Sequence, residues 1–449
     1  MANISKSNVP QFSVDIYQNE FLPEGGREVN AIVTVTSTGG GTTGGLPLAT
    51  HGPADVPGSA AGAAVVIMVD CSGSMDYPPT KMRSAREATA AAIDTIRDGV
   101  AFAVVAGTHV AKEVYPGNGG VAVAGPATRH QAKEALRRLS SGGGTAIGTW
   151  LRLADRLLST AEVSIRHGIL LTDGRNEHEK PEQLRAALES CAGRFTCDAR
   201  GVGTDWEVKE LTGIASALLA TVDIVADPSG LEADFRRMME TAMGKEVADV
   251  ALRVWTPQGA EIQYVKQVAP TVEDLTARRT EAGPRAGDYP TGSWGDESRD
   301  YHVNVVVPAA GVGQEMLAAR ISLVLPQPDG TPSVLGQGLV RALWTDDMAA
   351  STRINPQVAH YTGQAELAQV IQQGLEARKQ GDLDSATAKL GRAVQLASAS
   401  GNDDTAKLLA KVVDVVDAAT GTVRLKARVA DADEMTLETR STKTVRVKK

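Results

Sequence analysis

The spacing of hydrophobic residues changes several times along the chain. Residues 10–37 alternate apolar and polar positions around a Pro-Glu-Gly-Gly turn, which predicts two strands. Residues 38–62 are rich in Gly, Thr, Pro and Ala and show no period, which predicts a linker. From residue 63 onward, apolar runs alternate with helical patterns.

These apolar runs are typical of strands buried on both faces of a sheet. They lie at 63–69, 102–108 and 166–172, with shorter strands expected at 110–116, 196–202 and 220–225. Helical patterns lie at 81–97, 127–139, 146–160, 181–192, 206–218 and 230–243, and we expect Gly244 to end the last one as a C′ glycine. The alternation predicts an α/β domain with a doubly wound parallel sheet over residues 63–243.

Residues 244–346 return to strands bounded by turns, which predicts a β-sandwich. Two strands at residues 10–37 cannot form a stable unit alone, so we expect them to complete this sandwich. The α/β domain is then an insertion in a loop of the sandwich. The Gly/Pro-rich stretch 278–299 predicts a long exposed loop.

Residues 355–419 predict three helices. Part of this segment resembles one tetratricopeptide hairpin, with Gly381 and Asp382 at its turn, but we favour a small helical bundle because one repeat is too short for a solenoid. The tail 420–449 is basic, with eight Lys/Arg against four Asp/Glu. Its hydroxyl residues suggest a phosphorylation target, although we favour a terminal strand pair on the sandwich; they are Thr436, Thr439, Ser441, Thr442 and Thr444.

Composition excludes several functions. The chain has 449 residues, a net charge of -8 and only 4% aromatic residues, which argues against a nucleic-acid-binding face. No apolar run is long enough to span a membrane, and the N-terminus lacks the pattern of a signal peptide. Three cysteines in so long a chain suit a reducing compartment, so we expect a cytoplasmic protein.

Candidate chemistry lies in three separated segments. Asp70, Ser72 and Ser74 follow the strand at 63–69, Thr145 lies on a glycine-rich turn, and Asp173 follows the strand at 166–172. The C-terminal ends of parallel strands share one edge of the sheet, where ligands bind. We therefore expect these residues to meet.

Three hydroxyls and two carboxylates are hard oxygen ligands, which suit Mg²⁺, Ca²⁺ or Mn²⁺ and not zinc. Hydroxyls are neutral, so an ion that they hold directly keeps much of its positive charge. A vacant coordination position then attracts a carboxylate from elsewhere.

The arrangement resembles the von Willebrand factor A (VWA) family, whose metal-ion-dependent adhesion site (MIDAS) has the pattern Asp-x-Ser-x-Ser, a distant Thr and a distant Asp. Asp70, Ser72, Ser74, Thr145 and Asp173 match it without departure. The resemblance implies that the two serines and the threonine contact the metal directly. It implies that the aspartates lie mainly outside this first layer of ligands.

The whole chain is also similar to bacterial VWA proteins found in actinobacteria, some of which act alongside Ser/Thr kinases, phosphatases, forkhead-associated domains or stress systems. That resemblance implies an intracellular scaffold and does not identify the partner.

Enzyme motifs do not fit the same residues. A haloacid-dehalogenase-type phosphatase requires a second Asp where Ser72 stands, and no Gly-x-Ser-x-Gly, P-loop lysine or dinucleotide glycine pattern is present at the site. Cys191 and Cys197 lack enough soft partners for zinc, with His178 a weak candidate, and Cys71 is expected in the core. We expect Asp76 to be a solvated turn residue, and we expect surface or packing roles for His109, His130, His167 and His178.

The sequence therefore predicts a non-enzymatic binding module that docks a partner's Asp or Glu on a divalent cation. Two alternatives remain: a metal-dependent hydrolase, which lacks an evident general base, and a structural subunit in which the metal joins copies of the chain.

Overall fold

The computed structural model describes residues 10–38, 62–327 and 330–447. The chain divides into two compact units. Of the described residues, unit 1 comprises Pro10, residues 62–248 and Gly292–Gly295, and unit 2 comprises Gln11–Thr38, Asp249–Thr291 and residues 296–327 and 330–447. Segments of unit 2 both precede and follow the main segment of unit 1, so the predicted insertion of an α/β domain into a second fold is confirmed. Most of the predicted linker 38–62 lies outside the described residues.

Unit 1 is built on a seven-stranded sheet with the order β10-β9-β8-β4-β5-β6, and β7 also pairs with β5. Its strands are β4 (Ala63–Asp70), β5 (Ala101–Gly107), β6 (Ala111–Tyr115), β7 (Ala122–Val123), β8 (Ile165–Thr172), β9 (Thr196–Val202) and β10 (Val222–Val225). The five strands from β10 to β5 are parallel, whereas β6 and β7 run antiparallel to β5. The predicted parallel sheet is confirmed.

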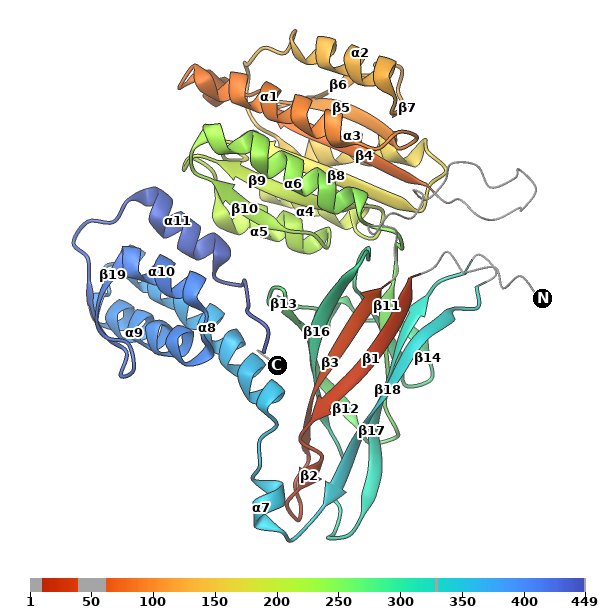
Figure 1. Cartoon of the computed structure of the whole chain (residues 1–449), viewed down its shortest axis with the longest axis vertical. Helices are drawn as coiled ribbons and strands as arrows, with labels where there is room; N and C mark the ends of the chain where they lie inside the picture. Colours follow the sequence, from red (N-terminus) through yellow and green to blue (C-terminus); the bar gives the residue numbers. More distant parts are fainter. Residues whose placement is uncertain (1–9, 39–61, 328–329, 448–449) are drawn as a thin grey trace. The chain divides into compact units, whose positions relative to one another are not determined.

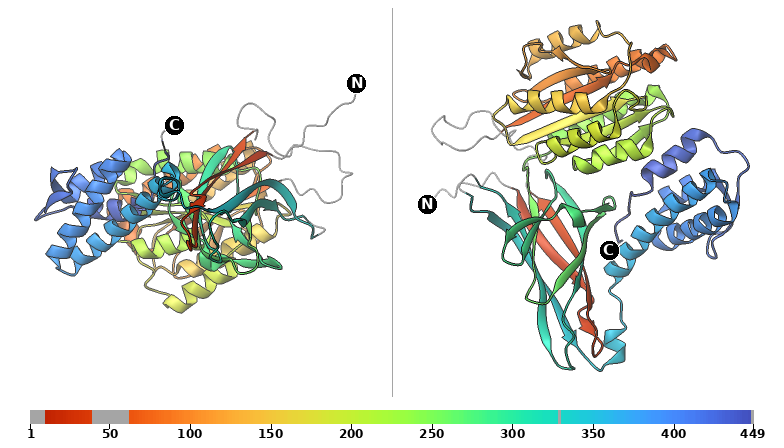
Figure 2. Two further views of the ribbon diagram at one scale, coloured as in Figure 1. Left: turned by 90° about the horizontal axis from the view of Figure 1, so that it is seen from below. Right: turned by 180° about the vertical axis from the view of Figure 1, so that it is seen from behind.

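Helices cover both faces of this sheet. They are α1 (Thr80–Thr95), α2 (Pro126–Leu136), α3 (Ile147–Ser159), α4 (Pro181–Cys191), α5 (Val208–Ala217) and α6 (Leu231–Met243), with short helices η1 (Gly73–Asp76) and η2 (Pro228–Gly230). Helices α1, α2 and α6 lie over one face (Figure 1), and their side chains form one core with alternate residues of β4 and β5. Helices α3, α4 and α5 lie over the opposite face, which the view from behind shows (Figure 2).

The ends of the helices were predicted to within a few residues, with one error of cap geometry. Gly244 is the C-cap of α6, but its φ of -80° is ordinary right-handed backbone and not the left-handed conformation of a C′ glycine. The helix ends there although the residue makes no use of its conformational freedom.

Two antiparallel sheets form the β-sandwich of unit 2, with one parallel pairing of β2 and β18. One has the order β1-β3-β16-β12-β13 and the other β14-β15-β11-β17-β18-β2. Their strands are β1 (Gln11–Gln18), β2 (Phe21–Leu22), β3 (Glu28–Thr38), β11 (Ala251–Trp255), β12 (Glu261–Ala269), β13 (Glu273–Asp274), β14 (Thr280–Gly283), β15 (Ala286–Pro290), β16 (Glu297–Val306), β17 (Glu315–Leu325) and β18 (Ser333–Trp344). The N-terminal strand β3 pairs with β16 along its length, so segments far apart in sequence form one sheet.

The two sheets pack face to face. A Cβ added at Gly336 of β18 would lie 2.8 Å from Cγ2 of Val14 in β1, and one at Gly338 would lie 2.5 Å from Cγ1 of Ile16. The glycines therefore let the sheets approach closely at this point, since any larger residue would overlap β1.

The prediction of a long loop at 278–299 is wrong. This segment contains part of the short helix η3 (Thr276–Arg278), then β14 and β15, which form a hairpin turned by Arg285 at a positive φ of 62°. Its glycines and prolines suggested a loop, but β15 pairs with β11, whose paired residues lie 31 to 39 positions earlier in the sequence. The local pattern does not encode that partner.

The C-terminal part of unit 2 is mainly helical. It contains α7 (Met348–Ser351), α8 (Pro356–Lys379), α9 (Leu383–Ser400), α10 (Asp403–Val412) and α11 (Asp431–Arg440), with a hairpin of β19 (Val413–Asp417) and β20 (Thr422–Leu425). Asp382 caps α9 by accepting a hydrogen bond from the Ser385 N–H, at the turn predicted between α8 and α9. The prediction of a third helix extending through 419 is wrong, because the chain turns into β19 at Val413.

The prediction of a separate basic tail at 420–449 is also wrong in most respects. Strand β20 pairs with β19 and not with the sandwich, and α11 buries Leu437 in the core of the helical part. Thr439 and Ser441 are buried, so neither is on an exposed tail. Only the last described residues approach the sandwich, where Thr444 donates its N–H to the carbonyl oxygen of Pro270.

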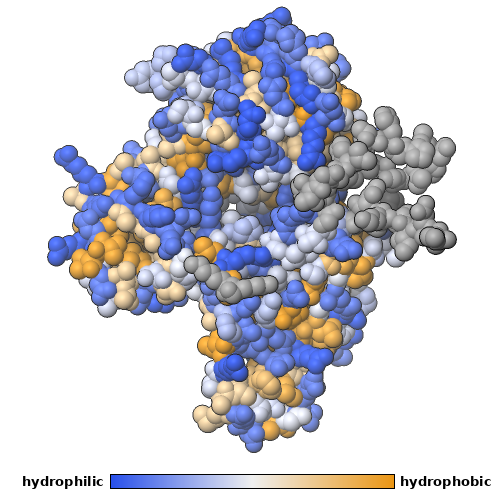
Figure 3. Space-filling model, in the orientation of Figure 1, coloured by the Kyte–Doolittle hydropathy of each residue, from blue (hydrophilic) through white to orange (hydrophobic). Residues whose placement is uncertain are grey.

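Among the described residues, no helix combines the length and apolar character that crossing a bilayer requires. The molecular face drawn in Figure 3 is mostly hydrophilic, with hydrophobic residues in small scattered groups. Isolated exposed hydrophobic residues are ordinary on protein surfaces.

Candidate metal centre

The two candidate aspartates lie at the same edge of the unit 1 sheet. Asp70 is the last residue of β4, and Asp173 directly follows β8. Because β4 and β8 are parallel neighbours, with Val69 opposite Leu171, both carboxylates emerge together. Both side chains are fully buried.

Both carboxylate oxygens of Asp70 accept hydrogen bonds from the protein. Oδ1 accepts from the Ser72 N–H at 2.8 Å, and Oδ2 accepts from the Thr172 hydroxyl at 2.6 Å. Burial raises the pKa of Asp70 to about 6, although hydrogen bonds from Ser72 and Thr172 oppose the shift. Asp70 is therefore held in place by donors on β8 and on the loop that follows β4.

The two serines lie beside Asp173. The Oγ atoms of Ser72 and Ser74 are 2.9 Å apart, and the Ser74 hydroxyl donates to Asp173 Oδ1 at 2.7 Å. Ser72 is buried and Ser74 is exposed at the start of the short helix η1. This pair is the part of the site that connects the buried carboxylates to the surface.

Thr145 approaches the same point from the glycine-rich turn. A Cβ added at Gly174 would lie 3.3 Å from Ser74 Oγ and 3.6 Å from Thr145 Oγ1, so both hydroxyls surround the space that this glycine leaves free. The structure thus brings all five predicted residues together at one edge of the sheet.

The glycine-rich turn is fastened to the loop after β4 by backbone hydrogen bonds. The Gly142 N–H donates to the Cys71 carbonyl at 2.8 Å, and the Gly73 N–H donates to the Gly143 carbonyl at 2.9 Å. Gly143 has a φ of 81°, and a Cβ there would lie 2.8 Å from Nδ1 of His109. A glycine is required on both grounds, backbone conformation and space.

Two more side chains belong to the site and were not assigned to it from the sequence. Lys81, in the first turn of α1, is buried and forms an ion pair with Asp173 Oδ2. His178 was expected to have a surface or packing role, but its ring Nδ1 accepts the Thr145 N–H at 3.2 Å and its backbone N–H donates to the Thr145 carbonyl at 3.0 Å. A lysine in the first turn of a helix, where the dipole disfavours a cation, was the available signal for Lys81. Nothing in the local pattern marks His178.

The other candidates lie outside the group of five. Cys71 is buried, and its burial raises its pKa to about 12, so it remains a thiol. Cys191 and Cys197 are free and buried, and burial raises the pKa of both. Asp76 is exposed and accepts a hydrogen bond from the Ser141 hydroxyl. Across the part of the chain that the structure describes, no cluster of three or more His, Cys, Asp and Glu side chains suits a metal.

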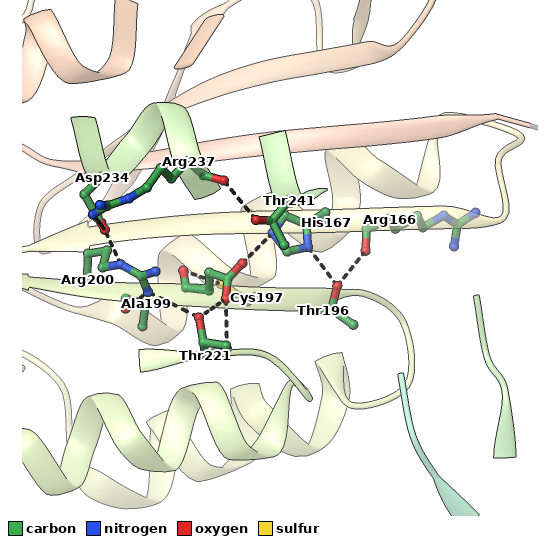
Figure 4. Close-up of polar contacts among 11 residues, drawn as sticks. Arg166, His167, Thr196, Cys197, Ala199, Arg200, Thr221, Asp234, Arg237 and Thr241 are labelled. Carbon is green, nitrogen blue, oxygen red and sulfur yellow. Dashed lines mark hydrogen bonds and ion pairs between the residues drawn. The ribbon is translucent and has the colours of Figure 1, made fainter. Parts of the chain in front are cut away.

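His167 belongs to a separate polar cluster near the N-terminal ends of β8 and β9, away from the strand ends that carry Asp70 and Asp173. Its Nδ1 lies 2.9 Å from the Thr196 hydroxyl, and its Nε2 lies 3.0 Å from Asp198 Oδ2. Burial alone would raise the pKa of Asp198, but His167 and Arg200 lower it below the usual value. Figure 4 shows Arg200 facing Asp234 in the same cluster. These groups satisfy one another, which accounts for the cluster structurally.

The donor set at the sheet edge fits a hard divalent cation. It offers three hydroxyl oxygens around one space and two carboxylates directly behind them, and such oxygen ligands suit Mg²⁺, Ca²⁺ or Mn²⁺. Each carboxylate oxygen already accepts a hydrogen bond from a protein group. The hydroxyls of Ser72, Ser74 and Thr145 would hold the ion, and Asp70 and Asp173 would orient them and supply negative charge.

Comparison with known proteins agrees with this geometry. Family models match in two places, a von Willebrand factor type A domain over residues 65–176 and a von Willebrand factor type A C-terminal domain over residues 395–441. No curated protein matches the chain.

Of three similar solved structures, two match nearly the whole chain and one matches less than half of it. The von Willebrand factor type A protein from Catenulispora acidiphila is 52% identical, covers 99% of both chains and superposes with a TM-score of 0.90. The ArnB paralog VWA2 from Sulfolobus acidocaldarius shares the fold at 14% identity, with a TM-score of 0.58 over 96% of this chain and 98% of that one. Proximal thread matrix protein 1 from the mussel byssus, described with a zinc-occupied MIDAS motif, is 25% identical over 41% of this chain and 46% of that chain, at a TM-score of 0.35.

The relative from Catenulispora acidiphila covers almost the whole chain at a level of identity that leaves no doubt of common descent. The match extends beyond the α/β unit to the sandwich and the C-terminal helices, where a second family model also applies. The chain therefore belongs to the von Willebrand factor type A family.

Proposed function

We propose that this protein is a metal-dependent binding module and not an enzyme. Unit 1 holds a divalent cation, with Mg²⁺ our first choice, at Ser72, Ser74 and Thr145 in front of Asp70 and Asp173. An Asp or Glu of a protein partner completes the coordination of the ion. VWA domains often mediate metal-dependent protein interactions, which is the general basis of the proposal.

One observation carries the proposal: the two carboxylates are committed to protein donors, while the hydroxyls of Ser72, Ser74 and Thr145 gather beside them, with Ser74 exposed. Neutral hydroxyls leave most of the charge of a bound ion uncompensated. A carboxylate from outside then gains a strong electrostatic interaction in a partly dehydrated site.

Two candidate general bases near the site are engaged by other groups, which supports a binding role over hydrolysis. Glu179, on the loop that follows Asp173, accepts hydrogen bonds from the Gly148 N–H at 2.8 Å and the Asn176 side chain at 2.9 Å. The Nδ1 of His178 is engaged by Thr145. Neither group is placed to activate a metal-bound water through these atoms.

We also propose a cytoplasmic scaffold role, in which the sandwich and the C-terminal helices present the binding unit to other proteins. The resemblance to actinobacterial VWA proteins supports kinases, phosphatases or forkhead-associated proteins as candidate partners.

Calorimetric titration of metal-free protein with Mg²⁺ and Mn²⁺ tests the metal site. Asp70→Ala and Thr145→Ala should each weaken binding at least about tenfold, because each removes charge or an oxygen at the ion. Thr241→Ala, which removes an exposed hydroxyl on α6 bonded to the Arg237 carbonyl, is the matched control and should bind as wild type does.

Affinity capture with and without EDTA, read by mass spectrometry, tests the partner. A protein retained by wild type in Mg²⁺ and released both by EDTA and by Thr145→Ala supports the proposal. Capture that survives EDTA and both substitutions unchanged contradicts it, and metal-dependent turnover in a hydrolase screen that is lost in Asp70→Ala would favour the enzyme alternative.

A further inference from the structure

A buried lysine lies in the metal site, and the binding role described above does not use it. Lys81 is only 5% exposed. Its Nζ pairs with Asp173 Oδ2 and also donates to the Ser74 carbonyl at 3.3 Å. Ser74 also carries one of the three hydroxyls that would hold the ion, so the Lys81 ammonium contacts two residues of the proposed metal site.

This arrangement is costly for the fold. An ammonium group loses its hydration on burial, and the first turn of a helix disfavours a cation. No acidic residue lies in the first turn of α1 to offset that position. Asp173, directly after β8 and 92 positions away in the sequence, supplies the compensating charge.

Lys81 changes the charge balance of the site. Asp70 and Asp173 together carry two negative charges when ionised, which would neutralise a divalent ion. Lys81 returns one positive charge, so these three side chains together with the ion retain a net positive charge. Repulsion between the ammonium and the ion weakens metal binding, and the uncompensated charge attracts an anionic ligand.

We propose that Lys81 is a built-in counter-cation that lowers the affinity of the site for its metal and raises the affinity of the loaded site for a carboxylate. The inference rests on the proposed function. It assigns to Lys81 the balance between affinity for the metal and affinity for the carboxylate. A purely positioning role for Lys81, in which it only holds Asp173 in place, makes the opposite prediction for metal binding.

Titration of metal-free protein with Mn²⁺ distinguishes the two roles by the sign of the effect. Lys81→Met removes the charge and keeps most of the apolar stem, and it should bind Mn²⁺ about tenfold more tightly than wild type. Weaker or unchanged binding in Lys81→Met would overturn the proposal. Lys81→Arg keeps the charge and should stay near the wild-type affinity.

Lys133→Met is the matched control for loss of one positive charge. Lys133 pairs with Asp94 at the surface of the same unit, and both side chains are partly exposed. It should leave Mn²⁺ affinity unchanged, which separates a local effect of Lys81 from a change in net charge.

Thermal unfolding covers the case in which Lys81→Met destabilises the metal-free fold. The variant leaves the buried Asp173 without its cation, so its metal-free midpoint should fall. Saturating Mn²⁺ should then raise its midpoint by more than it raises that of wild type, because ligand binding stabilises in proportion to affinity. A smaller rise would overturn the proposal.

Acetate serves as the carboxylate probe for the second half of the proposal. Water-proton relaxation of the Mn²⁺-loaded protein reports acetate displacing metal-bound water, and acetate affinity should be several-fold weaker in Lys81→Met than in wild type. Equal or tighter acetate binding in the variant contradicts it. If neither wild type nor Lys81→Met binds Mn²⁺, the proposed function itself fails. Binding of Mn²⁺ by Lys81→Met alone would support the proposal, since it would show that Lys81 strongly lowers the affinity for the metal.

Discussion

Asp70 and Asp173 are fully buried carboxylates whose oxygens are all engaged by hydroxyl, amide or ammonium donors. Such full engagement is what a buried carboxylate needs, since an unpaired one costs several kcal/mol. It also fixes the positions of Ser74 and Thr172 without any metal. At the scale of single residues, the site is therefore organised by hydrogen bonds before an ion arrives.

Thr145 is held in a comparable way by His178, which both accepts from and donates to its backbone. His178→Ala removes the acceptor for the Thr145 N–H, and we expect metal affinity to fall about threefold to tenfold. His178→Asn places an amide oxygen near the position of Nδ1 and should restore most of the affinity. Titration with Mg²⁺ measures both, and a failure of the asparagine to rescue would show that the imidazole acts by bulk alone.

At the scale of elements, glycines decide how closely helices approach the unit 1 sheet. A Cβ at Gly107, the last residue of β5, would lie 2.3 Å from Cε2 of Trp150 in α3. Trp150 is fully buried and donates its indole N–H to the Thr108 carbonyl at 2.6 Å. The indole therefore rests directly on the backbone of β5, next to the chain that leads to the glycine-rich turn.

Gly107→Ala should destabilise unit 1 by about 1–3 kcal/mol, because the methyl group overlaps an indole that cannot move away. Gly213→Ala is the contrasting variant: Gly213 is exposed in α5, and nothing lies within 4 Å of an added Cβ. It should stabilise by about 0.5–1 kcal/mol through helix propensity. Denaturant unfolding measures both, and effects of the same sign would contradict the packing argument.

A buried histidine in the sheet that contains β3 and β16 should make unit 2 less stable in acid. His302 is buried on β16, where its Nε2 lies 2.9 Å from Asn30 Oδ1 on β3. Burial, together with the nearby charge of Lys266, lowers the pKa of His302 to about 4. The unfolded chain therefore takes up a proton at higher pH than the folded one.

The contribution of His302 is fully present above about pH 6.5 and is lost as the pH falls toward 4, by up to about 3 kcal/mol. His302→Gln retains a donor for Asn30 but does not titrate, so the stability difference between variant and wild type should change over this window. Chemical unfolding at pH 4.5 and 7.5 measures the change. Burial raises the pKa of Asp70 to about 6 and that of Glu210 to about 7, so these two groups change the stability with pH in the direction opposite to His302. Their contributions are the same in wild type and in His302→Gln, so they cancel in the difference. A pH-independent difference would show that His302 is not responsible.

At the scale of the whole molecule, the predicted metal ligands all lie in unit 1. Unit 2 is formed from both sides of this insertion and has hydrophobic cores of its own. Ligand binding stabilises the structure that contains the site.

Saturating Mg²⁺, at a hundred times its dissociation constant, should therefore raise the unfolding midpoint of unit 1 by about 5–10 °C and leave that of unit 2 in place. Scanning calorimetry with and without EDTA measures both transitions. A shift of both together would show that the two units unfold as one, and the absence of any shift would contradict metal binding.

Local patterns were sufficient for the elements that bury their own apolar positions. The alternating helices and strands of unit 1, and the strands of residues 10–37, follow from periodicity because each element carries its own burial pattern. The edge position of Asp70 and Asp173 also followed from the sequence, since parallel strands place their C-terminal ends at one edge.

Only the tertiary structure decided the remainder, because the deciding partners are remote in the sequence. Strand β15 forms by pairing with β11, and α11 packs Leu437 into the core of the helical part. Lys81 is buried because it pairs with Asp173. A lysine, a histidine or a glycine-rich segment has no preferred role until another element lies against it. The sequence by itself determined which oxygen atoms meet at the sheet edge. The packing of α1 decided the net charge of the site, because it places Lys81 against Asp173. The hydrogen bonds of His178 decided how firmly Thr145 is held.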